Sequence, residues 1–360
     1  MVKLGALDFV RFFYWTLRRN RAAAVHMLGV PPRFLLSAAR LFRLFRISRV
    51  RRPVVAIALM DAMGDIVAAE PIARLARRLY PGAHICWITR SQFVSLPDSY
   101  PEVDDVIGVG CLTEWMLLRR LKLFDVVWDL HHGGRICLFC CIPQVKPGVS
   151  QNEHNYFDLG NLLDMFCDSA GLPRLSDGPT LNPPSASVES VDALLLPPRF
   201  MVIHCVSSDP NKDWPADKWR DLTAQIITTQ DVTIVEVGTR PLVITSDGAR
   251  MRSLCGKLTM LETAEVIRRA DVFIGIDSGP AHLANAVATP GVILLGAYKH
   301  FHSYMPYSGG YATGETAAVI RIDGPVAGVS VEDVFTSVVA RTGRDLSVAD
   351  RAAVGLSESF

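Results

Sequence analysis

The chain has 360 residues, of which 49% are hydrophobic and 20% are charged, and its formal net charge is +1. That is enough apolar sequence for two ordinary domains, each with its own core. No internal repeat of solenoid period is present, which excludes a repeat architecture. The charge is uneven, because residues 1–52 hold twelve Lys or Arg against the single acid Asp8, a balance of +11 that leaves −10 for the remainder. This asymmetry predicts a basic arm on a mildly acidic globule.

The basic arm contains a pattern typical of an amphipathic helix between Arg33 and Val50. At helical spacing one face carries Phe34, Ala38, Leu41 and Phe45, and the opposite face carries Arg33, Arg40, Arg43 and Arg46. We expect such a helix to lie in the headgroup plane of an anionic membrane. A helix packed on the protein with a solvated arginine face, a nucleic-acid-binding arm and an organelle transit peptide are the alternatives, although no nucleic-acid module follows.

The segment before this helix, Ala22 to Pro32, is uncharged but too short to cross a bilayer, and we expect it to end at Pro31-Pro32. No secretory signal is recognisable, so we expect a reducing, cytosolic compartment.

Strands and helices alternate after residue 53, which predicts an α/β fold with doubly wound parallel sheets. In the first half the expected strands are 54–60, 85–89, 103–107 and 124–130, with helices near 61–79, 113–123 and 157–170. In the second half the expected strands are 200–205, 232–237, 272–276 and 292–295, with helices opening at 214–219 and over 281–288 and 334–340. The stretch 181–198 is rich in Pro and Ser, which favours an interdomain link.

The cysteines include one run with metal-like spacing, Cys137-x-x-Cys140-Cys141. No second pair with a nearby His completes a four-ligand set in the sequence, so the spacing alone favours small core residues over a structural zinc site. Whether Cys137, Cys140 and Cys141 bind anything stays open at this point.

The most informative stretch runs from Asp271 to Gly296 and reads strand, tight turn, helix, strand. Its turn, Asp277-Ser278-Gly279-Pro280, would leave the backbone N–H groups of a first helical turn at the carboxyl edge of a sheet, where a phosphate is stabilised. His282 follows in the same helix, either beside the phosphates or as a buried residue that orients the turn.

Two further positions are candidates for chemistry. Asp65 directly follows Met63-Gly64 after the first strand, where it could be a helix N-cap or a general base. Lys212 lies in a polar loop after Ser207 and Ser208, and an ammonium with hydroxyls could clamp a diphosphate, although a solvated loop lysine is the simpler interpretation.

These residues carry a resemblance to glycosyltransferase family 9, the ADP-heptose:lipopolysaccharide heptosyltransferases. DSGPAHLANAVATPGVILLGA, from Asp277 to Ala297, resembles the family's D-[ST]-G-x-x-H-L-x-x-A donor motif, and the match extends back through the segment 256–271. Met63-Gly64-Asp65-Ile66 resembles the M-G-D-[VI] motif, and Lys212 to Trp219 resembles K-x-W-P-x-x-x-[FW]. One departure is Gly296-Ala297-Tyr298, where the family usually has G-P-T.

The resemblance implies a GT-B fold of two Rossmann-like domains facing a central cleft, with acceptor on the first and nucleotide sugar on the second. It implies that Asp65 is the catalytic base, that Lys212 acts with it, and that the donor is bound by Ser207, Ser208, Lys212, Asp277, Ser278, Gly279 and His282. No metal and no cofactor beyond the donor, expected to be ADP-heptose, is implied. The expected domains are an extension (1–52), an acceptor domain (53–185), a linker (186–198), a nucleotide-sugar domain (199–345) and a tail (346–360).

We therefore predict an inverting, metal-independent glycosyltransferase that moves a heptose or related sugar to a lipopolysaccharide-type or lipid-linked glycan acceptor. The enzyme would be cytoplasmic, held through residues 1–52 at the anionic inner face of the cytoplasmic membrane, with no nucleic-acid partner. A transferase using another nucleotide-hexose donor is the alternative within this class. A non-catalytic membrane scaffold that binds nucleotide sugars is the alternative from a different class.

Overall fold

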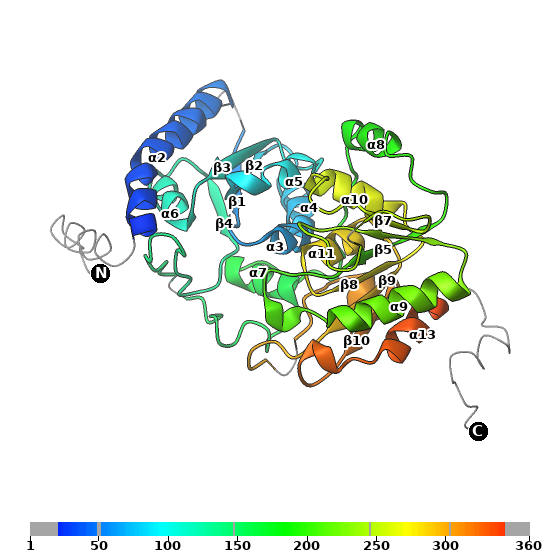
Figure 1. The fold of residues 1–360 in the computed structure, drawn as a ribbon. Helices are drawn as coiled ribbons and strands as arrows, with labels where there is room; N and C mark the ends of the chain where they lie inside the picture. The colour runs from blue at the N-terminus through cyan, green and yellow to red at the C-terminus, as the bar shows by residue number, and fades with distance from the viewer. Residues whose placement is uncertain (1–20, 49–51, 147, 245, 302–303, 343–360) are drawn as a thin grey trace. The chain divides into compact units, whose positions relative to one another are not determined.

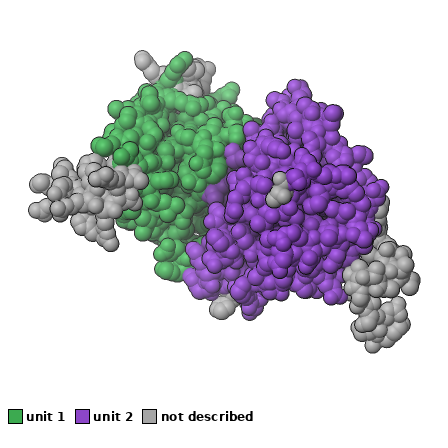
Figure 2. Space-filling model, viewed as in Figure 1, with its two compact units in different colours: residues 1–61, 72–156, 165–173 green, residues 62–71, 157–164, 174–360 purple. Residues whose placement is uncertain are grey.

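The computed structural model describes residues 21–48, 52–146, 148–244, 246–301 and 304–342, and within them the chain is α/β with two parallel sheets (Figure 1). The chain divides into two compact units (Figure 2). The first comprises residues 1–61, 72–156 and 165–173, and the second comprises residues 62–71, 157–164 and 174–360. The predicted tail, residues 346–360, and the first part of the predicted extension, residues 1–20, lie outside the described residues.

The first unit is built on a four-stranded sheet in the order β3-β2-β1-β4, in which every pairing is parallel. Its strands are β1 (Val54–Ala58), β2 (His84–Arg90), β3 (Asp105–Val109) and β4 (Val126–Asp129). All five residues of β1 are buried, because helices cover both faces of a doubly wound sheet and leave no solvated side. The helices along this part of the chain are α4 (Glu70–Leu79), α5 (Ser95–Asp98), α6 (Leu112–Arg120) and α7 (Leu162–Ala170).

Helix α2 (Arg21–Ser48) packs against α6 and β3 (Figure 1). The expectation that a segment ends at Pro31-Pro32 is wrong, because the helix continues through both prolines. Proline removes a backbone hydrogen bond and usually breaks a helix. Here Met27 before the prolines and Leu41 after them are both buried in the core of the first unit, so tertiary packing holds the helix together across the defect.

The face of α2 that was predicted to meet lipid is the face that packs on the protein. Ala38 and Leu41 are only 7% and 1% exposed, and Phe34 is partly buried against the same core. Arg33 forms an ion pair with Glu114 at 3.5 Å. The structure therefore matches the packed-helix alternative for this face, while the side chain of Phe45 lies outside the described residues. In the described part of the chain, no helix is both long enough and apolar enough to cross a membrane.

The second unit is built on a six-stranded parallel sheet in the order β10-β9-β8-β5-β6-β7. Its strands are β5 (Phe200–His204), β6 (Thr233–Glu236), β7 (Met251–Ser253), β8 (Phe273–Ile276), β9 (Gly291–Leu295) and β10 (Ala317–Arg321). Its main helices are α3 (Met63–Ala68), α8 (Ser185–Asp192), α9 (Ala216–Thr229), α10 (Met260–Arg268), α11 (Gly279–Ala286), α12 (Gly310–Thr313) and α13 (Val331–Thr342). The edge strands β7 and β10 were not predicted, since their residues are largely half-exposed and lack a buried apolar run.

Two segments differ from expectation in their local structure. Helix α7 begins at Leu162, so residues 157–161 of the predicted helix are turn instead. The predicted linker, residues 186–198, contains most of helix α8, which packs on α10 and is tied to it by an ion pair from Asp192 to Arg269 at 2.6 Å. The predicted domain boundaries stay a prediction.

Helices α3 and α11 pack closely against each other within the second unit. A Cβ atom added at Gly64 would lie 2.6 Å from Cδ2 of His282, and one added at Gly279 would lie 2.2 Å from Cε of Met63. Contacts below 3 Å would force a shift, of the buried His282 ring at Gly64 and of the flexible end of Met63 at Gly279, so Gly64 is the glycine that the close approach requires. The packing brings the Met63-Gly64-Asp65 motif beside the Ser278-Gly279 motif.

Candidate active site

Lys212 and Asp277 form an ion pair at the carboxyl ends of two neighbouring strands. Lys212 ends a short 3-10 turn (Pro210–Lys212) in the loop after β5, and Asp277 directly follows β8, which pairs with β5 in parallel. The loop is closed by its own hydrogen bonds, from Ser207 N–H to Asp213 at 2.7 Å and from Lys212 N–H to the Asp209 carbonyl at 2.9 Å. Parallel strands end at one edge of a sheet, which is why two residues 65 positions apart meet here.

Tyrosines from the segment after β9 surround this ion pair. The Lys212 ammonium lies 4.3 Å from the centroid of the Tyr298 ring and 3.2 Å from the Tyr304 hydroxyl. Tyr304 and Tyr307 donate hydrogen bonds to Asp277, the second at 3.4 Å. The cation therefore has a carboxylate on one side and aromatic faces on another, an arrangement that holds an ammonium in one place.

The charges of this cluster are set by burial and pairing. Asp277 is buried, which by itself raises its pKa, but the charge of Lys212 and the neighbouring His282 hold the pKa below its ordinary value. Burial raises the pKa of Tyr304 and of Tyr307 well above the ordinary value, so both stay hydroxyl donors at neutral pH. At neutral pH the cluster thus holds one carboxylate, one ammonium and two neutral phenols.

His282 is buried one turn into α11, and burial lowers its pKa to about 4. Its ring is neutral at physiological pH, with Nδ1 buried and without a hydrogen-bond partner in the described part of the chain. The ring packs against Tyr307, with centroids 4.9 Å apart. A neutral imidazole offers a dipole, not a positive charge, to a ligand beside it.

The remaining predicted donor-site residues lie at the same strand ends. Ser278 is the N-cap residue of α11 and Gly279 is its first residue, while the Ser278 hydroxyl donates to the Ile276 carbonyl at 3.1 Å. Ser207 donates its hydroxyl to the Asp209 carbonyl at 2.6 Å, and Ser208 is exposed. The sequence therefore predicted a set of residues that the structure gathers at the ends of β5 and β8.

Asp65 lies in the first turn of α3, and its carboxylate accepts a hydrogen bond from the Ala62 backbone N–H at 2.7 Å. In a capping box, an acid at the third helical position accepts a hydrogen bond from the backbone N–H of the N-cap residue, and this bond is of that kind. The N-cap interpretation of Asp65 is therefore wrong, because Ala62 is the N-cap residue and Asp65 is the third residue of the helix. The side chain is half-exposed, so a carboxylate oriented by its own helix also faces solvent.

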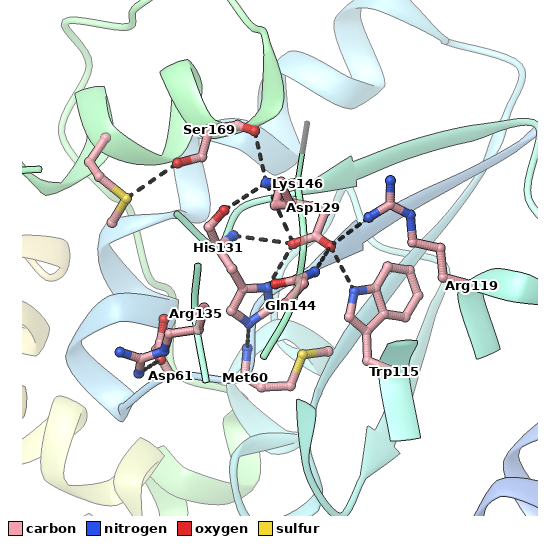
Figure 3. A network of polar contacts seen from close by, with 11 residues as sticks. Met60, Asp61, Trp115, Arg119, Asp129, His131, Arg135, Gln144, Lys146 and Ser169 are labelled. Atoms are coloured by element: carbon pink, nitrogen blue, oxygen red, sulfur yellow. Dashed lines mark hydrogen bonds and ion pairs between the residues drawn. The ribbon is translucent and has the colours of Figure 1, made fainter. Parts of the chain in front are cut away.

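The first unit holds a second polar network, centred on Asp129 at the end of β4 (Figure 3). The buried carboxylate accepts hydrogen bonds from Trp115 at 3.0 Å, from Arg119 at 3.2 Å and from the His131 ring at 2.7 Å, and also from Gln144. Burial raises its pKa, but His131 and Lys146 hold that pKa well below its usual range. His131 in turn accepts the Met60 N–H at 2.9 Å, which fixes the ring.

A pocket opens beside this network, entirely within the first unit. Its polar lining comes from Asp61, Arg90, His131 and Arg135, and Arg135 pairs with Asp61. One wall is formed by the loop that carries Cys137 and Cys140. The pocket therefore combines two guanidinium groups with one acid, a lining suited to a polar, anionic ligand.

Sequence reasoning missed Tyr304 and Tyr307, which complete the shell of Asp277. The segment after β9 places aromatic residues at positions 298, 301, 304, 307 and 311, and this spacing of three to four was the available signal. No motif marks it, because the chain here has Gly296-Ala297-Tyr298 where the resembled family has G-P-T.

Known proteins resemble this chain in sequence and in structure. A family model for glycosyltransferase family 9 (heptosyltransferase) matches residues 173–311. The lipopolysaccharide heptosyltransferase 3 of Escherichia coli is 46% identical over 285 residues, which are 68% of this chain and 84% of that protein. The lipopolysaccharide core heptosyltransferase OpsX of Haemophilus influenzae is 23% identical over 289 residues, which are 69% of this chain and 80% of that protein.

The structure of E. coli ADP-heptose lps heptosyltransferase II matches with a TM-score of 0.62 at 19% identity, covering 81% of this chain and 98% of that chain. The structure of E. coli heptosyltransferase WaaC with ADP matches with a TM-score of 0.55 at 16% identity, covering 80% of this chain and 99% of that one. These likenesses confirm the GT-B fold. With a 46% identical relative whose length it largely covers, this chain belongs to glycosyltransferase family 9 and is a glycosyltransferase.

Proposed function

We propose that this chain transfers a heptose from ADP-heptose to a lipopolysaccharide-type acceptor, by a single inverting displacement that needs no metal. The names of its relatives support the sugar and the acceptor. The observation that carries the proposal is the Lys212–Asp277 pair within its shell of tyrosines, at the strand ends beside the first turn of α11. This cluster supplies what a diphosphate leaving group requires, namely a fixed cation and backbone N–H groups.

In this mechanism Asp65 is the general base. It accepts the proton of the acceptor hydroxyl while that oxygen forms a bond to the anomeric carbon of the donor. The bond from the anomeric carbon to the diphosphate oxygen breaks at the same time, and ADP leaves with its growing charge beside Lys212. The hydrogen bond from Ala62 N–H supports this role, because it orients the carboxylate before substrate arrives.

Asp277 acts as a positioning residue in this scheme. Its carboxylate is buried and stays ionised through its pairing with Lys212, so it fixes the ammonium at the end of β8. Ser207, Ser208, Ser278 and Gly279 provide hydroxyl and backbone groups at the same edge, and neutral His282 offers a hydrogen-bonding nitrogen. The pocket of the first unit, with Arg90 and Arg135 in its lining, is the proposed site for the anionic acceptor.

The deciding experiment is calorimetric titration of ADP, UDP and GDP, without added metal, into the wild type, Lys212→Ala and Lys257→Ala. Lys257 is the matched control, because it is an exposed lysine of the same unit. The one hydrogen bond described for its ammonium goes to the Ser253 carbonyl. Loss of one charged hydrogen bond is worth ~1.5–3 kcal/mol, so ADP affinity should fall about 10- to 100-fold in Lys212→Ala and hold in the control.

Each outcome selects one reading of the site. Tight ADP binding that weakens only in Lys212→Ala supports the proposal. A preference for UDP or GDP would overturn the donor and favour a transferase that uses another nucleotide-hexose. Absence of binding by all three nucleotides would overturn the proposal, whereas ADP-heptose binding without turnover would favour the non-catalytic scaffold.

We further propose that the enzyme works at the anionic inner face of the cytoplasmic membrane, through the outward face of α2. That face exposes Leu28, Leu35, Leu36 and Phe42 at 51–73%, with Arg40 and Arg43 also exposed. Exposed apolar side chains beside arginines suit an interface rich in anionic lipid. Deleting residues 1–52 would also remove the core residues Met27 and Leu41, so surface substitutions test the idea more cleanly.

The measurement is sedimentation with anionic liposomes for the wild type, the double variant Leu35→Ser/Leu36→Ser and the control Val145→Ser. Val145 is 78% exposed in the same unit but is not on α2. Removing two inserted leucines costs roughly 2–5 kcal/mol of membrane binding, so the double variant should stay in the supernatant. Equal sedimentation of all three proteins would exclude α2 as the contact.

A further inference from the structure

Three elements of the first unit bring a histidine and three cysteines together. His26 lies on α2, Cys111 is the N-cap residue of α6, and Cys137 and Cys140 belong to the loop after β4. The ligand atoms of His26, Cys111 and Cys140 all lie within 4.8 Å of one another. Cys137 is buried in the same core cluster as Cys111 and Cys140, and it lines the pocket of the first unit together with Cys111. The sequence showed only the Cys137-x-x-Cys140 half of this set, because its partners lie 26 and more positions away.

The spacing of the sulfur atoms fits a tetrahedral ion. Two thiolates bound to zinc at about 2.3 Å, with a tetrahedral angle between them, lie roughly 3.8 Å apart. The Sγ atoms of Cys111 and Cys140 are 3.8 Å apart. The distance is well above the S–S bond length of about 2.05 Å, and all eight cysteines are free thiols in the structure.

The loop that carries two of the cysteines is folded tightly upon itself. Cys137 N–H donates to the Ile142 carbonyl at 2.9 Å, and Cys141 N–H donates to the Cys137 carbonyl at 2.7 Å. Cys141 takes a φ of 56°, a left-handed value that few residues other than glycine adopt, and this reverses the chain directly after Cys140. Cys137 and Cys140 are both buried, while the Cys141 side chain is exposed.

His26 is held against this loop by its ring, which stacks on Phe139 with centroids 4.6 Å apart. Arg33 Nη2 is 3.2 Å from both the ring Nε2 and the main-chain oxygen of His26, so the guanidinium keeps a partner when the ring nitrogen binds a cation.

The charge of the ligand set also suits a divalent cation. Three thiolates and one neutral imidazole around a dication leave a net charge of −1, and the Arg33 guanidinium, which also pairs with Glu114, lies beside His26. Ligands of three sulfurs and one nitrogen select zinc over magnesium or calcium, which prefer oxygen.

We propose that His26, Cys111, Cys137 and Cys140 bind a structural zinc ion that fastens α2 and the 137–140 loop to the start of α6. Cys111, Cys137, Leu138 and Phe139 also line the pocket of the first unit, so the ion would brace one wall of that pocket. The site is separate from the Lys212–Asp277 cluster and does not depend on the function proposed above.

The test is the metal content of the full chain, expressed with zinc in the medium and purified without chelator. We expect about one zinc per chain in the wild type by inductively coupled plasma mass spectrometry. Cys140→Ser and His26→Gln should lose most of it, whereas the neighbouring exposed thiol variant Cys141→Ser should keep it. Circular dichroism identifies any variant that fails to fold.

A second measurement uses the wild type alone, so that the test of the zinc site does not depend on whether the variants fold. Cobalt exchanged into the site should give the intense absorption of a tetrahedral thiolate complex, and chelation of zinc should lower Tm and increase proteolysis within α2. Three results would overturn the proposal. They are wild-type protein without bound metal, equal metal loss in Cys141→Ser and Cys140→Ser, and a Cys111–Cys140 disulfide in the purified chain. Iron in place of zinc would overturn the identity of the ion.

Discussion

Two buried aspartates, one in each unit, occupy corresponding places and differ in their surroundings. Asp129 ends β4 in the first unit, and Asp277 directly follows β8 in the second. Both are about 5% exposed, and both have a pKa held below the ordinary value by neighbouring cations. Burial and a lowered pKa alone would rank them equally as functional candidates.

The two carboxylates differ in the residues that surround them. Asp129 accepts from Trp115, Arg119, His131 and Gln144, and Lys146 beside it is itself only 7% exposed and bonded to three carbonyls. Asp277 is paired with Lys212, which is 23% exposed, and lies beside His282, whose Nδ1 is without a partner among the described residues. Each network has one buried atom without a partner among the described residues, Gln144 Oε1 beside Asp129 and His282 Nδ1 beside Asp277. The difference lies in the cations: the buried Lys146 is held by three carbonyls, which indicates a structural role, whereas the more exposed Lys212 is open to a ligand.

The largest expected effect is on catalysis, in Asp65→Asn. Removing a general base lowers kcat about 10²- to 10⁴-fold, while Asp217→Asn should change kcat less than about tenfold. Asp217 is the control because it is also an acid in the first turn of a helix of the second unit, α9, and its side chain is exposed. Steady-state transfer assays measure both variants, and equal losses would remove the distinction between the two acids.

The next effect is on stability, in Asp129→Asn. The substitution leaves Lys146 as a buried cation without its counter-charge, which should cost about 3–5 kcal/mol of unfolding free energy. Urea denaturation measures the unfolding free energy. The control is Asp98→Asn, an exposed position of the same unit, whose unfolding free energy should lie within about 0.5 kcal/mol of wild type. A fully stable but inactive Asp129→Asn would mean that the Asp129 network is part of the catalytic machinery.

A smaller effect is expected in Gly64→Ala, which tests the contact between α3 and α11. Alanine usually stabilises a helix relative to glycine, but here its Cβ would lie 2.6 Å from the His282 ring. We expect a net loss of about 1–3 kcal/mol, together with reduced activity, because His282 or α3 must shift. Gly82→Ala is the control, since nothing lies within 4 Å of its added Cβ. Stabilisation by both substitutions would show that the two helices are not tightly packed.

Much of the second unit could be predicted because its signals are contiguous. The run from Asp271 to Gly296 contains a buried strand, a turn, a helix and a second strand, and each is found within one or two residues of its expected place. Local patterns of this kind depend on hydrophobic periodicity and turn chemistry, which a sequence displays directly. The tyrosine shell was missed because no local pattern connects Tyr304 with Asp277, which lies 27 positions earlier.

By itself the sequence determined the α/β class, the alternation of its elements, the resemblance to family 9 and the candidate donor-site residues near Asp277, but not the tyrosines around it. Only the tertiary structure decided which face of α2 is buried, that α2 continues through two prolines, and that Cys111 and His26 meet the Cys137-x-x-Cys140 loop. The physical reason is that periodicity identifies an amphipathic face but not its partner, and that side chains from distant elements meet only when a core is formed.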